Sequence, residues 1–264
     1  MKLSIITVNL NNREGLKKTI DSVVAQTFRD FEWIVIDGGS TDGSRELIEQ
    51  YADHFAYWVS EPDKGIYNAM NKGIKVAKGE YLQFLNSGDW LCDEKVLQKV
   101  FDSGPDEQIV YGDCLESDGS LHVFPSSLDA LYFYRDMLNH QASFIRSSLL
   151  EEGYDENYKY ASDWLFFLQK IVFGNVSYRK VNHVIIGVQP GKSYNVAISD
   201  AERVSILNQL FPPLLKNSME KLSAMTANPM RPYYDHIDAN PKLGKWVRWL
   251  VRLHRRLNKG RKGD

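Results

Sequence analysis

Three apolar runs in the first third of the chain end at polar residues that could bind a metal ion or a nucleotide. Asn9 ends "SIITVN", Asp37 ends "FEWIVID", and Asp89 lies in "FLNSGDWL". Mg²⁺ and Mn²⁺ prefer oxygen ligands, and a carboxylate also accepts a hydrogen bond from the N–H of a base. Gly, Ser, Thr and Asp are ordinary turn residues as well, so the turn at Asp37, taken alone, is better explained as a structural turn.

Strands that alternate with helices would bring these three residues together. Helical spacing is found at Leu16–Val24, Arg45–Tyr51 and Tyr67–Ala77. The predicted strands around these helices are Leu3–Leu10, Phe31–Asp37, Tyr57–Ser60 and Tyr81–Leu85. Such an order implies right-handed crossovers and a largely parallel α/β sheet, in which ligands bind outside the carboxyl ends of the strands. We therefore expect one site at that edge.

The second half of the chain has a looser pattern. "IVYGDC" and "LHVF" suggest antiparallel edge strands, and "SDWLFFLQKIVF" predicts an apolar helix. Two or three helices are expected after Ser199. We predict one domain over residues 1–198, with two halves at 1–95 and 96–198. A helical extension would follow at 199–264.

The composition is that of a globular protein. The 264 residues are 43% hydrophobic, and no apolar run approaches the roughly 18 residues of a membrane span. The N-terminus is typical of a strand rather than a signal peptide, which favours a cytoplasmic location. The two cysteines, Cys92 and Cys114, are too few for a disulfide framework or a zinc site, and we interpret them as reduced thiols.

The sequence argues against three functional classes. Dinucleotide binding needs a glycine-rich turn after the first strand, but "NLNNREG" has one late glycine. A nucleotidyltransferase would need a glycine-rich, basic phosphate loop near the N-terminus, and none is found. Nucleic-acid binding is disfavoured because the chain outside its C-terminal tail is acidic and carries no recognition motif.

A spaced series of motifs resembles family 2 glycosyltransferases, the inverting nucleotide-sugar enzymes with a GT-A fold. The motifs are "SIITVNLNN", "QTFRDFEWIVIDGGSTDGS", "DKGIYNAMNKGIKVAKGEYLQFLNSGDWL" and "YASDWLF". The resemblance covers about residues 3–195. It implies that residues 1–95 form the nucleotide-sugar-binding half of the domain and residues 96–198 the acceptor-binding half. It implies transfer of a hexosyl or N-acetylhexosaminyl group to a glycan or polyprenyl-linked acceptor in surface-polysaccharide biosynthesis.

The resemblance also implies roles for particular residues. Asp37 would accept from the base, most simply uracil, and Asp163 would be the catalytic base. The expected nucleotide- and donor-binding residues are Val8, Asn9, Asp37, Gly65, Asn71, Asn86, Ser87 and Asp89. His140, Gln141 and Trp164 are candidates for acceptor binding. From its position alone, Asp163 could instead cap the helix Trp164–Phe173.

The metal motif departs from the family pattern. The family reads Asp-x-Asp-Asp where this chain has Asn86, Ser87, Gly88 and Asp89, so that Gly88 replaces the usual ligand. Mg²⁺ or Mn²⁺ on a diphosphate needs only one or two protein carboxylates, and we predict that Asp89 holds the ion. The alternative is a non-catalytic nucleotide- or glycan-binding module with a degenerate motif, in which "NSGD" is only a polar turn.

The mechanism implied is a single displacement. Asp163 would deprotonate the acceptor hydroxyl while the metal ion stabilises the departing diphosphate, so that an α-linked donor gives a β-linked product.

The C-terminal tail is strongly basic. Residues 242–264 carry a formal charge of +8 on a chain whose net charge is −2, and the apolar positions of 243–257 fall on one helical face. Residues 242–262 are therefore predicted to lie on an anionic membrane surface, which would make the enzyme peripheral to the inner face of the cell membrane. The alternative is that this face packs on the protein itself or on a second subunit.

Overall fold

The computed structural model describes residues 1–189 and 195–227. The chain forms two compact units, Met1–Gln209 and Leu210–Asp264. The predicted boundary after residue 198 falls inside a helix of the first unit, α7 (Val196–Leu210), which crosses into the second unit only at its last residue.

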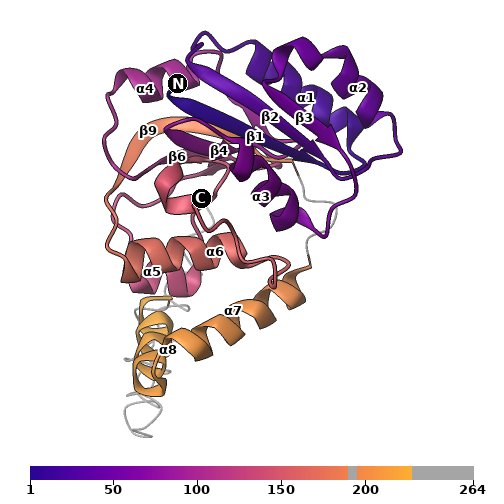
Figure 1. Ribbon diagram of the computed structural model, residues 1–264. Helices are drawn as coiled ribbons and strands as arrows, with labels where there is room; N and C mark the ends of the chain where they lie inside the picture. The colour runs from indigo at the N-terminus through magenta and orange to yellow at the C-terminus, as the bar shows by residue number, and fades with distance from the viewer. Residues whose placement is uncertain (190–194, 228–264) are drawn as a thin grey trace, which may run out of the picture. The chain divides into compact units, whose positions relative to one another are not determined.

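The first unit is built on one mixed sheet (Figure 1). Along its main path the strand order is β3-β2-β1-β4-β8-β6-β9-β5, and β7 pairs with β6. The pairs among β1, β2, β3 and β4 are parallel, β8 runs antiparallel to both of its neighbours, and β9 is parallel to β6. The strands are β1 (Leu3–Asn9), β2 (Phe31–Asp37), β3 (Tyr57–Ser60), β4 (Tyr81–Phe84), β5 (Trp90–Leu91), β6 (Ile109–Leu115), β7 (Leu121–His122), β8 (Ser143–Arg146) and β9 (Tyr178–Gly187).

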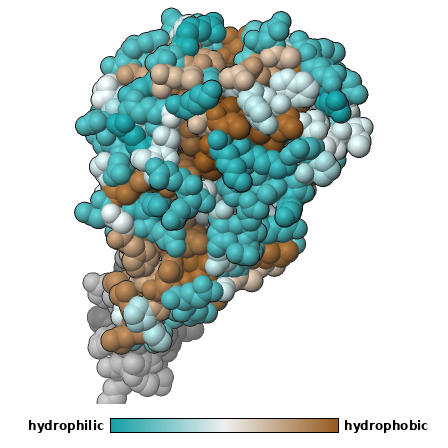
Figure 2. All heavy atoms as spheres, viewed as in Figure 1, coloured by the Kyte–Doolittle hydropathy of each residue, from teal (hydrophilic) through white to brown (hydrophobic). Residues whose placement is uncertain are grey.

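Helices cover both faces of this sheet (Figure 1). Helices α1, α2 and α4 lie on one face, and α3 and α6 lie on the other. The helical segments of the first unit are α1 (Arg13–Val24), α2 (Ser44–Gln50), η1 (Ala52–His54), α3 (Ile66–Val76), α4 (Val96–Asp102), α5 (Ala130–Arg135), η2 (Ser147–Leu150), α6 (Ser162–Phe167), the π-helical η3 (Leu168–Phe173) and α7. Figure 2 shows that the viewed surface over these elements is largely hydrophilic, with a smaller hydrophobic area between the polar residues.

The first four predicted strands are confirmed, each to within one residue. One expectation for the second half was wrong, and one strand was missed. Strand β6 is not an edge strand, because it pairs with β7, β8 and β9. Strand β9 was not predicted, since its first half, "YRKVN", mixes charged and apolar residues. The helix expected over "SDWLFFLQKIVF" forms, but it changes from α6 to the π-helical η3 at Leu168.

Helix α3 packs so closely on β1 that one helical position must be glycine. A Cβ added at Gly73 would lie 2.5 Å from Cγ2 of Ile6. We therefore expect Gly73→Ala to lower the free energy of unfolding by about 1–3 kcal/mol, the range for overpacking a core, despite alanine's better helix propensity. Urea unfolding measures this loss. Combining Gly73→Ala with Ile6→Ala should make the two costs less than additive, and strict additivity would show that the two side chains do not meet.

The second unit is described only in part. It contains helix α8 (Pro213–Ala227), on which Leu214, Leu215 and Leu222 are exposed. Within the described residues, no helix combines the length and the apolarity needed to cross a membrane. The basic segment 242–262, to which the membrane prediction applies, lies outside the described residues.

Candidate active site

The polar residues that end β1 and β2 meet at the carboxyl edge of the sheet, as predicted. Asn9 is paired with Asp37, and Asp37 with Ser60, in the parallel register. Asn9 Nδ2 donates to Asp37 Oδ1 at 2.7 Å. Among the described residues, Asn9 Oδ1 is a buried acceptor without a hydrogen-bond partner. It is therefore available to a ligand at this edge.

Asp37 is fully buried and its acceptor sites are filled. Besides Asn9, it accepts from the Ser40 backbone N–H at 2.9 Å, from Ser40 Oγ at 2.5 Å and from Ser60 Oγ at 2.6 Å. Burial raises its pKa, but these donors outweigh burial and hold the pKa below the usual value. A carboxylate offers about four lone-pair sites, so four donors leave none for a base. The predicted contact of Asp37 with uracil does not fit; Asp37 instead organises the turn after β2.

The turn beyond Asp37 has a glycine, Gly38, that lies against the Asp63 side chain. A side chain at Gly38 would collide with the carboxylate of Asp63 and come within 3.2 Å of Cδ1 of Leu10. The Asp63 carboxylate also accepts from the Gly65 backbone N–H at 2.9 Å. Asp63 was missed in the sequence because "EPDKG" looks like a plain turn. Its carboxylate lies beside Gly38, next to the end of β2.

The NSGD turn, residues 86–89, is held by hydrogen bonds to β1 and α1. The Ser87 backbone N–H donates to Val8 O at 3.0 Å, and Thr19 Oγ1 donates to Asp89 O at 2.7 Å and accepts from the Gly88 N–H at 2.9 Å. Gly88 has φ +105°, and a Cβ there would collide with Oε1 of Gln189. The glycine in the motif therefore permits both a left-handed backbone and the approach of the segment after β9.

The Asp89 side chain is nearly buried, with 5% exposed. Its Oδ1 accepts from the Gln189 backbone N–H at 2.9 Å, and its Oδ2 accepts from Gln141 Nε2 at 3.1 Å. Burial raises the pKa of this carboxyl to about 6, although both hydrogen bonds and the neighbouring His140 and Lys18 act in the opposite direction. The hydrogen bonds and neighbouring charges therefore offset only part of the cost of burying the Asp89 carboxylate.

These features fit a single-carboxylate metal site. Each Asp89 oxygen accepts one bond in the described chain, so about two of its four lone-pair sites remain, in contrast to Asp37. A cation would also relieve the cost of burying the charge. Within residues 1–189 and 195–227 no three His, Cys, Asp or Glu side chains form a metal-binding group, so the other ligands would be diphosphate and water oxygens.

Asp163, the expected catalytic base, is held in a buried hydrogen-bond network. It is 3% exposed. Its Oδ2 lies 2.6 Å from His140 Nδ1, and its Oδ1 accepts from Tyr67 Oη at 2.8 Å and from the Trp164 N–H at 2.9 Å. Burial raises the pKa of Asp163, but the bonds from His140, Tyr67 and Trp164 prevail and keep it below its usual value. Burial also raises the pKa of the Tyr67 phenol, which stays a donor.

A glutamate on α7 holds the segment before Asp163 in place. The Glu202 carboxylate accepts from the backbone N–H groups of Lys159, Tyr160 and Ala161 at 2.7–3.0 Å. Ala161 is the N-cap of α6, so the alternative in which Asp163 caps this helix is wrong.

Trp164 is 1% exposed, and its Nε1 donates to Phe133 O at 2.9 Å. The Arg203 guanidinium lies 4.8 Å from the Trp164 ring centre. The suggestion that Trp164 stacks on an acceptor sugar is therefore wrong, since its ring is part of the core.

His140 and Gln141 connect Asp163 with Asp89. They lie in the turn before β8, where Asn139 Oδ1 accepts from the Gln141 N–H at 2.8 Å. His140 contacts Asp163 and Gln141 donates to Asp89. On its other side, His140 Nε2 lies 3.5 Å from Asn86 Nδ2. The sequence placed both residues near an acceptor, but it could not show that they join the NSGD turn to α6.

Gly65 and Asn71 have different surroundings. Gly65 is the N-cap of α3, next to the end of β3, and a Cβ there would meet open space. Asn71 is buried, and its amide is engaged with both backbone groups of Tyr154 and with Glu156. Gly65 is thus at the ligand edge, whereas Asn71 joins α3 to the loop before α6 and does not face a donor phosphate.

Comparison with known proteins identifies the family. Residues 4–145 match the glycosyl transferase family 2. The chain belongs to this family. An uncharacterized glycosyltransferase of Mycobacterium tuberculosis is 34% identical over 224 residues, covering 80% of this chain and 85% of its own length. A PGL/p-HBAD biosynthesis glycosyltransferase of Mycobacterium bovis is 33% identical over 172 residues, covering 62% of this chain and 67% of its own.

Solved structures show the same fold, GT-A. S. aureus TarS 1–349 in complex with UDP-GlcNAc has a TM-score of 0.64 at 20% identity, covering 86% of this chain and 73% of that chain. The mannosyltransferase PcManGT from Pyrobaculum calidifontis, in complex with GDP-Man and Mn²⁺, has a TM-score of 0.62 at 15% identity, covering 93% and 82%. The predicted family and fold are thus confirmed.

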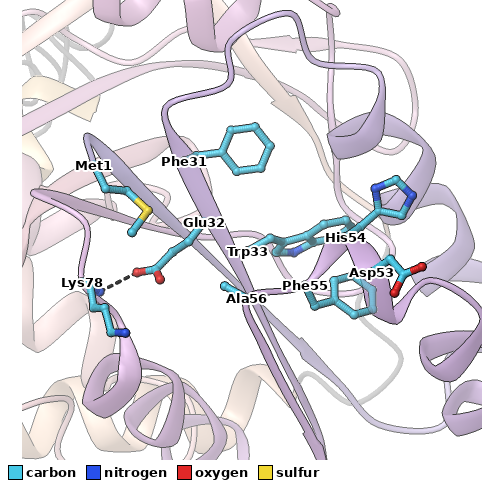
Figure 3. A pocket seen from close by; sticks show the side chains of 9 residues that line it. All are labelled: Met1, Phe31, Glu32, Trp33, Asp53, His54, Phe55, Ala56 and Lys78. Carbon is cyan, nitrogen blue, oxygen red and sulfur yellow. Dashed lines mark hydrogen bonds between the residues drawn. The ribbon is translucent and has the colours of Figure 1, made fainter.

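This family 2 glycosyltransferase also has a hollow at the opposite edge of the sheet. Figure 3 shows Phe31, Trp33 and Phe55 around it, with Glu32 hydrogen-bonded to the Lys78 N–H. Its volume is about 480 Å³. It adjoins the amino ends of β1 and β2, so it is separate from the carboxyl edge, where these strands end at Asn9 and Asp37.

Proposed function

We propose that this glycosyltransferase moves a hexosyl or N-acetylhexosaminyl group from a UDP-sugar to a glycan or polyprenyl-linked acceptor, with inversion. The observation that carries the proposal is the polar bridge between Asp89 and Asp163 through Gln141 and His140. It ties a candidate metal ligand and a candidate proton acceptor to two consecutive residues of one turn. A single displacement needs both groups. Negative charge develops on the leaving diphosphate, which a metal ion can stabilise, while the attacking hydroxyl loses its proton to a base.

The donor would lie along the carboxyl edge. Leu10, which is 57% exposed, and the Asp63 carboxylate beside Gly38 offer an apolar wall and an acceptor for the N3–H of uracil. The N-terminus of α3 behind Gly65 faces the same edge and favours negative charge, as a diphosphate requires. We assign base recognition to Asp63 in place of Asp37.

Asp89 would hold Mg²⁺ or Mn²⁺ against the diphosphate. When bound, the ion supplies Lewis-acid stabilisation of the leaving oxygen. The chain's own residues orient this carboxylate: Gln189 and Gln141 each donate to one oxygen. The PcManGT complex, which holds a nucleotide sugar together with Mn²⁺, supports this choice of cofactor.

A role in surface-glycan biosynthesis is supported by the Mycobacterium bovis relative, a PGL/p-HBAD biosynthesis glycosyltransferase. A glycan or polyprenyl-linked acceptor would suit a cytoplasmic enzyme that lies on the inner face of the membrane.

The test is release of the nucleotide from a panel of donors. Purified protein with Mn²⁺ is incubated with UDP-glucose, UDP-galactose, UDP-N-acetylglucosamine or GDP-mannose, and the liberated diphosphate is measured. We expect turnover of at least one UDP-sugar, no turnover of GDP-mannose and, once an acceptor is found, a β-linked product by NMR. Preference for GDP-mannose would contradict the uridine assignment. Tight UDP binding without turnover of any donor would favour the non-catalytic alternative.

A further inference from the structure

The hollow at the amino edge of the sheet exists because β2 begins before its neighbour β3. Strand β3 pairs with β2 only from Ile34 onward, and the Ala56 N–H donates to Trp33 O at 2.9 Å just before that pair. The first residues of β2 are therefore not covered by β3, and Asp53 and His54 of η1 line the space that remains. Its volume of about 480 Å³ falls within the roughly 300–1,000 Å³ of ligand clefts.

One side of the hollow is aromatic. Phe31 and Phe55 are half-buried, and the Phe55 ring packs edge-on against Trp33 with the ring centres 4.8 Å apart. Trp33 is 2% exposed and its Nε1 donates to Thr7 Oγ1 at 3.0 Å, so it holds the Phe55 ring in place. The face of an aromatic ring carries partial negative charge and attracts C–H groups, which a sugar ring presents on its apolar face.

A buried carboxylate with one unused oxygen also lines the hollow. Glu32 is 8% exposed, and its Oε1 accepts from Ser4 Oγ at 2.6 Å and from the Lys78 N–H at 2.5 Å. Within the described residues, its Oε2 accepts no hydrogen bond. Figure 3 shows this carboxylate turned toward Lys78, with the aromatic side chains across the hollow. A buried acceptor left unpaired costs free energy, which a ligand that donates to it would recover.

The charges around the hollow favour a neutral ligand. Lys78 lines the same space as Glu32, and in the described part of the chain its ammonium group forms neither a hydrogen bond nor an ion pair. Asp53 is an exposed acid on the side of η1. An organic cation would meet Lys78, and an anion would meet Glu32 and Asp53. A hydroxyl group both donates and accepts, so a ligand rich in hydroxyls matches this mixture of charges.

We propose that this hollow is a glycan-binding site separate from the donor site. One sugar ring lies against Phe31 and Phe55, while one of its hydroxyls donates to Glu32 Oε2 and another accepts from Lys78 Nζ. Glycosyltransferases act on carbohydrate and produce it, so such ligands are present where this enzyme works. Because the hollow is at the amino edge of the sheet, a glycan bound there leaves the carboxyl edge open to the donor. The site does not depend on which nucleotide sugar the enzyme uses.

The test is saturation-transfer NMR on the full chain with simple sugars as probes. The methyl glycosides of glucose, galactose, mannose and N-acetylglucosamine are each offered with and without UDP and Mn²⁺. We expect saturation transfer to at least one of them, mainly at the C–H groups of one ring face, and we expect UDP and Mn²⁺ to leave it unchanged. Agmatine, an organic cation, is the competing probe and should receive none.

Two variants locate the bound sugar. Glu32→Gln keeps an oxygen for its two hydrogen bonds inside the protein but loses the charge, and Phe55→Leu keeps apolar volume but loses the ring face. Glu32→Gln should weaken sugar binding about fivefold, the difference between a hydrogen bond to a charged and to a neutral group. Phe55→Leu should weaken it about threefold or more. Glu152→Gln and Phe173→Leu, at exposed positions outside the hollow, should bind as wild type. Urea unfolding checks that each variant is folded.

Three results would overturn the inference. The first is no saturation transfer to any of the four glycosides. The second is transfer that both Glu32→Gln and Phe55→Leu leave unchanged, or that UDP removes, because the sugar would then be bound elsewhere. The third is binding of agmatine in place of the sugars, which would make the hollow a site for an organic cation. Release of UDP is measured separately, so this inference and the proposed function can fail independently.

Discussion

Replacing Asp89 by Asn is expected to weaken UDP binding in the presence of Mn²⁺ by about 100-fold, since a metal site loses at least that much when its protein ligand is removed. Asp89 is the one carboxylate of the NSGD turn, and no group of three acidic, His or Cys side chains exists in the described residues to replace it. The amide keeps the size of the side chain, and its oxygen can still accept from the Gln189 N–H. The expected loss is therefore one of charge and not of fold.

Calorimetric titration of UDP with Mn²⁺, with Mg²⁺ and with EDTA separates the contributions. The wild type should need the metal, whereas Asp89→Asn should bind UDP equally weakly in all three conditions. Asp93→Asn is the matched control, because this exposed residue follows the same turn and pairs with Lys99. Tight binding by Asp89→Asn that still depends on metal would contradict the assignment of the ion to Asp89.

Replacing Asp37 by Ala is expected to lower the free energy of unfolding by about 3 kcal/mol, because the donors of Asn9, Ser40 and Ser60 lose their shared acceptor inside the protein. The folded-state pKa of Asp37 is below its ordinary value of 3.8. Its contribution should therefore be complete above about pH 4 and should be lost as pH falls through the folded-state pKa. In Asp37→Ala, this part of the acid dependence should disappear.

Urea unfolding at pH 7 and at pH 3 measures both effects. Asp53→Ala, on the exposed η1, is the control and should behave as wild type. The sequence-based interpretation, in which Asp37 binds the base, makes a different prediction: unchanged stability with loss of UDP affinity. That outcome would show that Asp37 has a free acceptor and that the hydrogen bonds around it do not stabilise the fold.

Local patterns were sufficient to predict one half of the fold. The strands that end at Asn9 and Asp37 are short apolar runs separated by helices, so their order and their shared edge follow from the alternation alone. Strand β9 was not predicted because its sequence contains Arg179, Lys180 and His183, which do not give the apolar run typical of an interior strand. In the structure it nevertheless pairs with the interior strand β6. Burial along β9 depends on which neighbours cover it, and that information is not local.

The sequence predicted which residues belong to the candidate site better than it predicted what each residue does. Motifs placed Asp37, Asp89 and Asp163 in one site, but hydrogen-bond saturation depends on partners distant in sequence. Ser60, which fills an acceptor site of Asp37, is 23 residues away, and His140 is also 23 residues from Asp163. Only the folded backbone brings them together, so the roles of Asp37, Asn71 and Trp164 could not be derived from their motifs.

Hydrogen–deuterium exchange with and without UDP and Mn²⁺ tests most directly whether the donor site lies at the carboxyl edge of the sheet. UDP should slow exchange in the segments that end β1 and β2, begin α3 and form the NSGD turn, residues 9–13, 38–44, 62–67 and 86–89. Exchange around the hollow of Phe31, Trp33 and Phe55 should not change (Figure 3). Protection confined to that hollow, or none at saturating UDP, would contradict a donor site at the carboxyl edge.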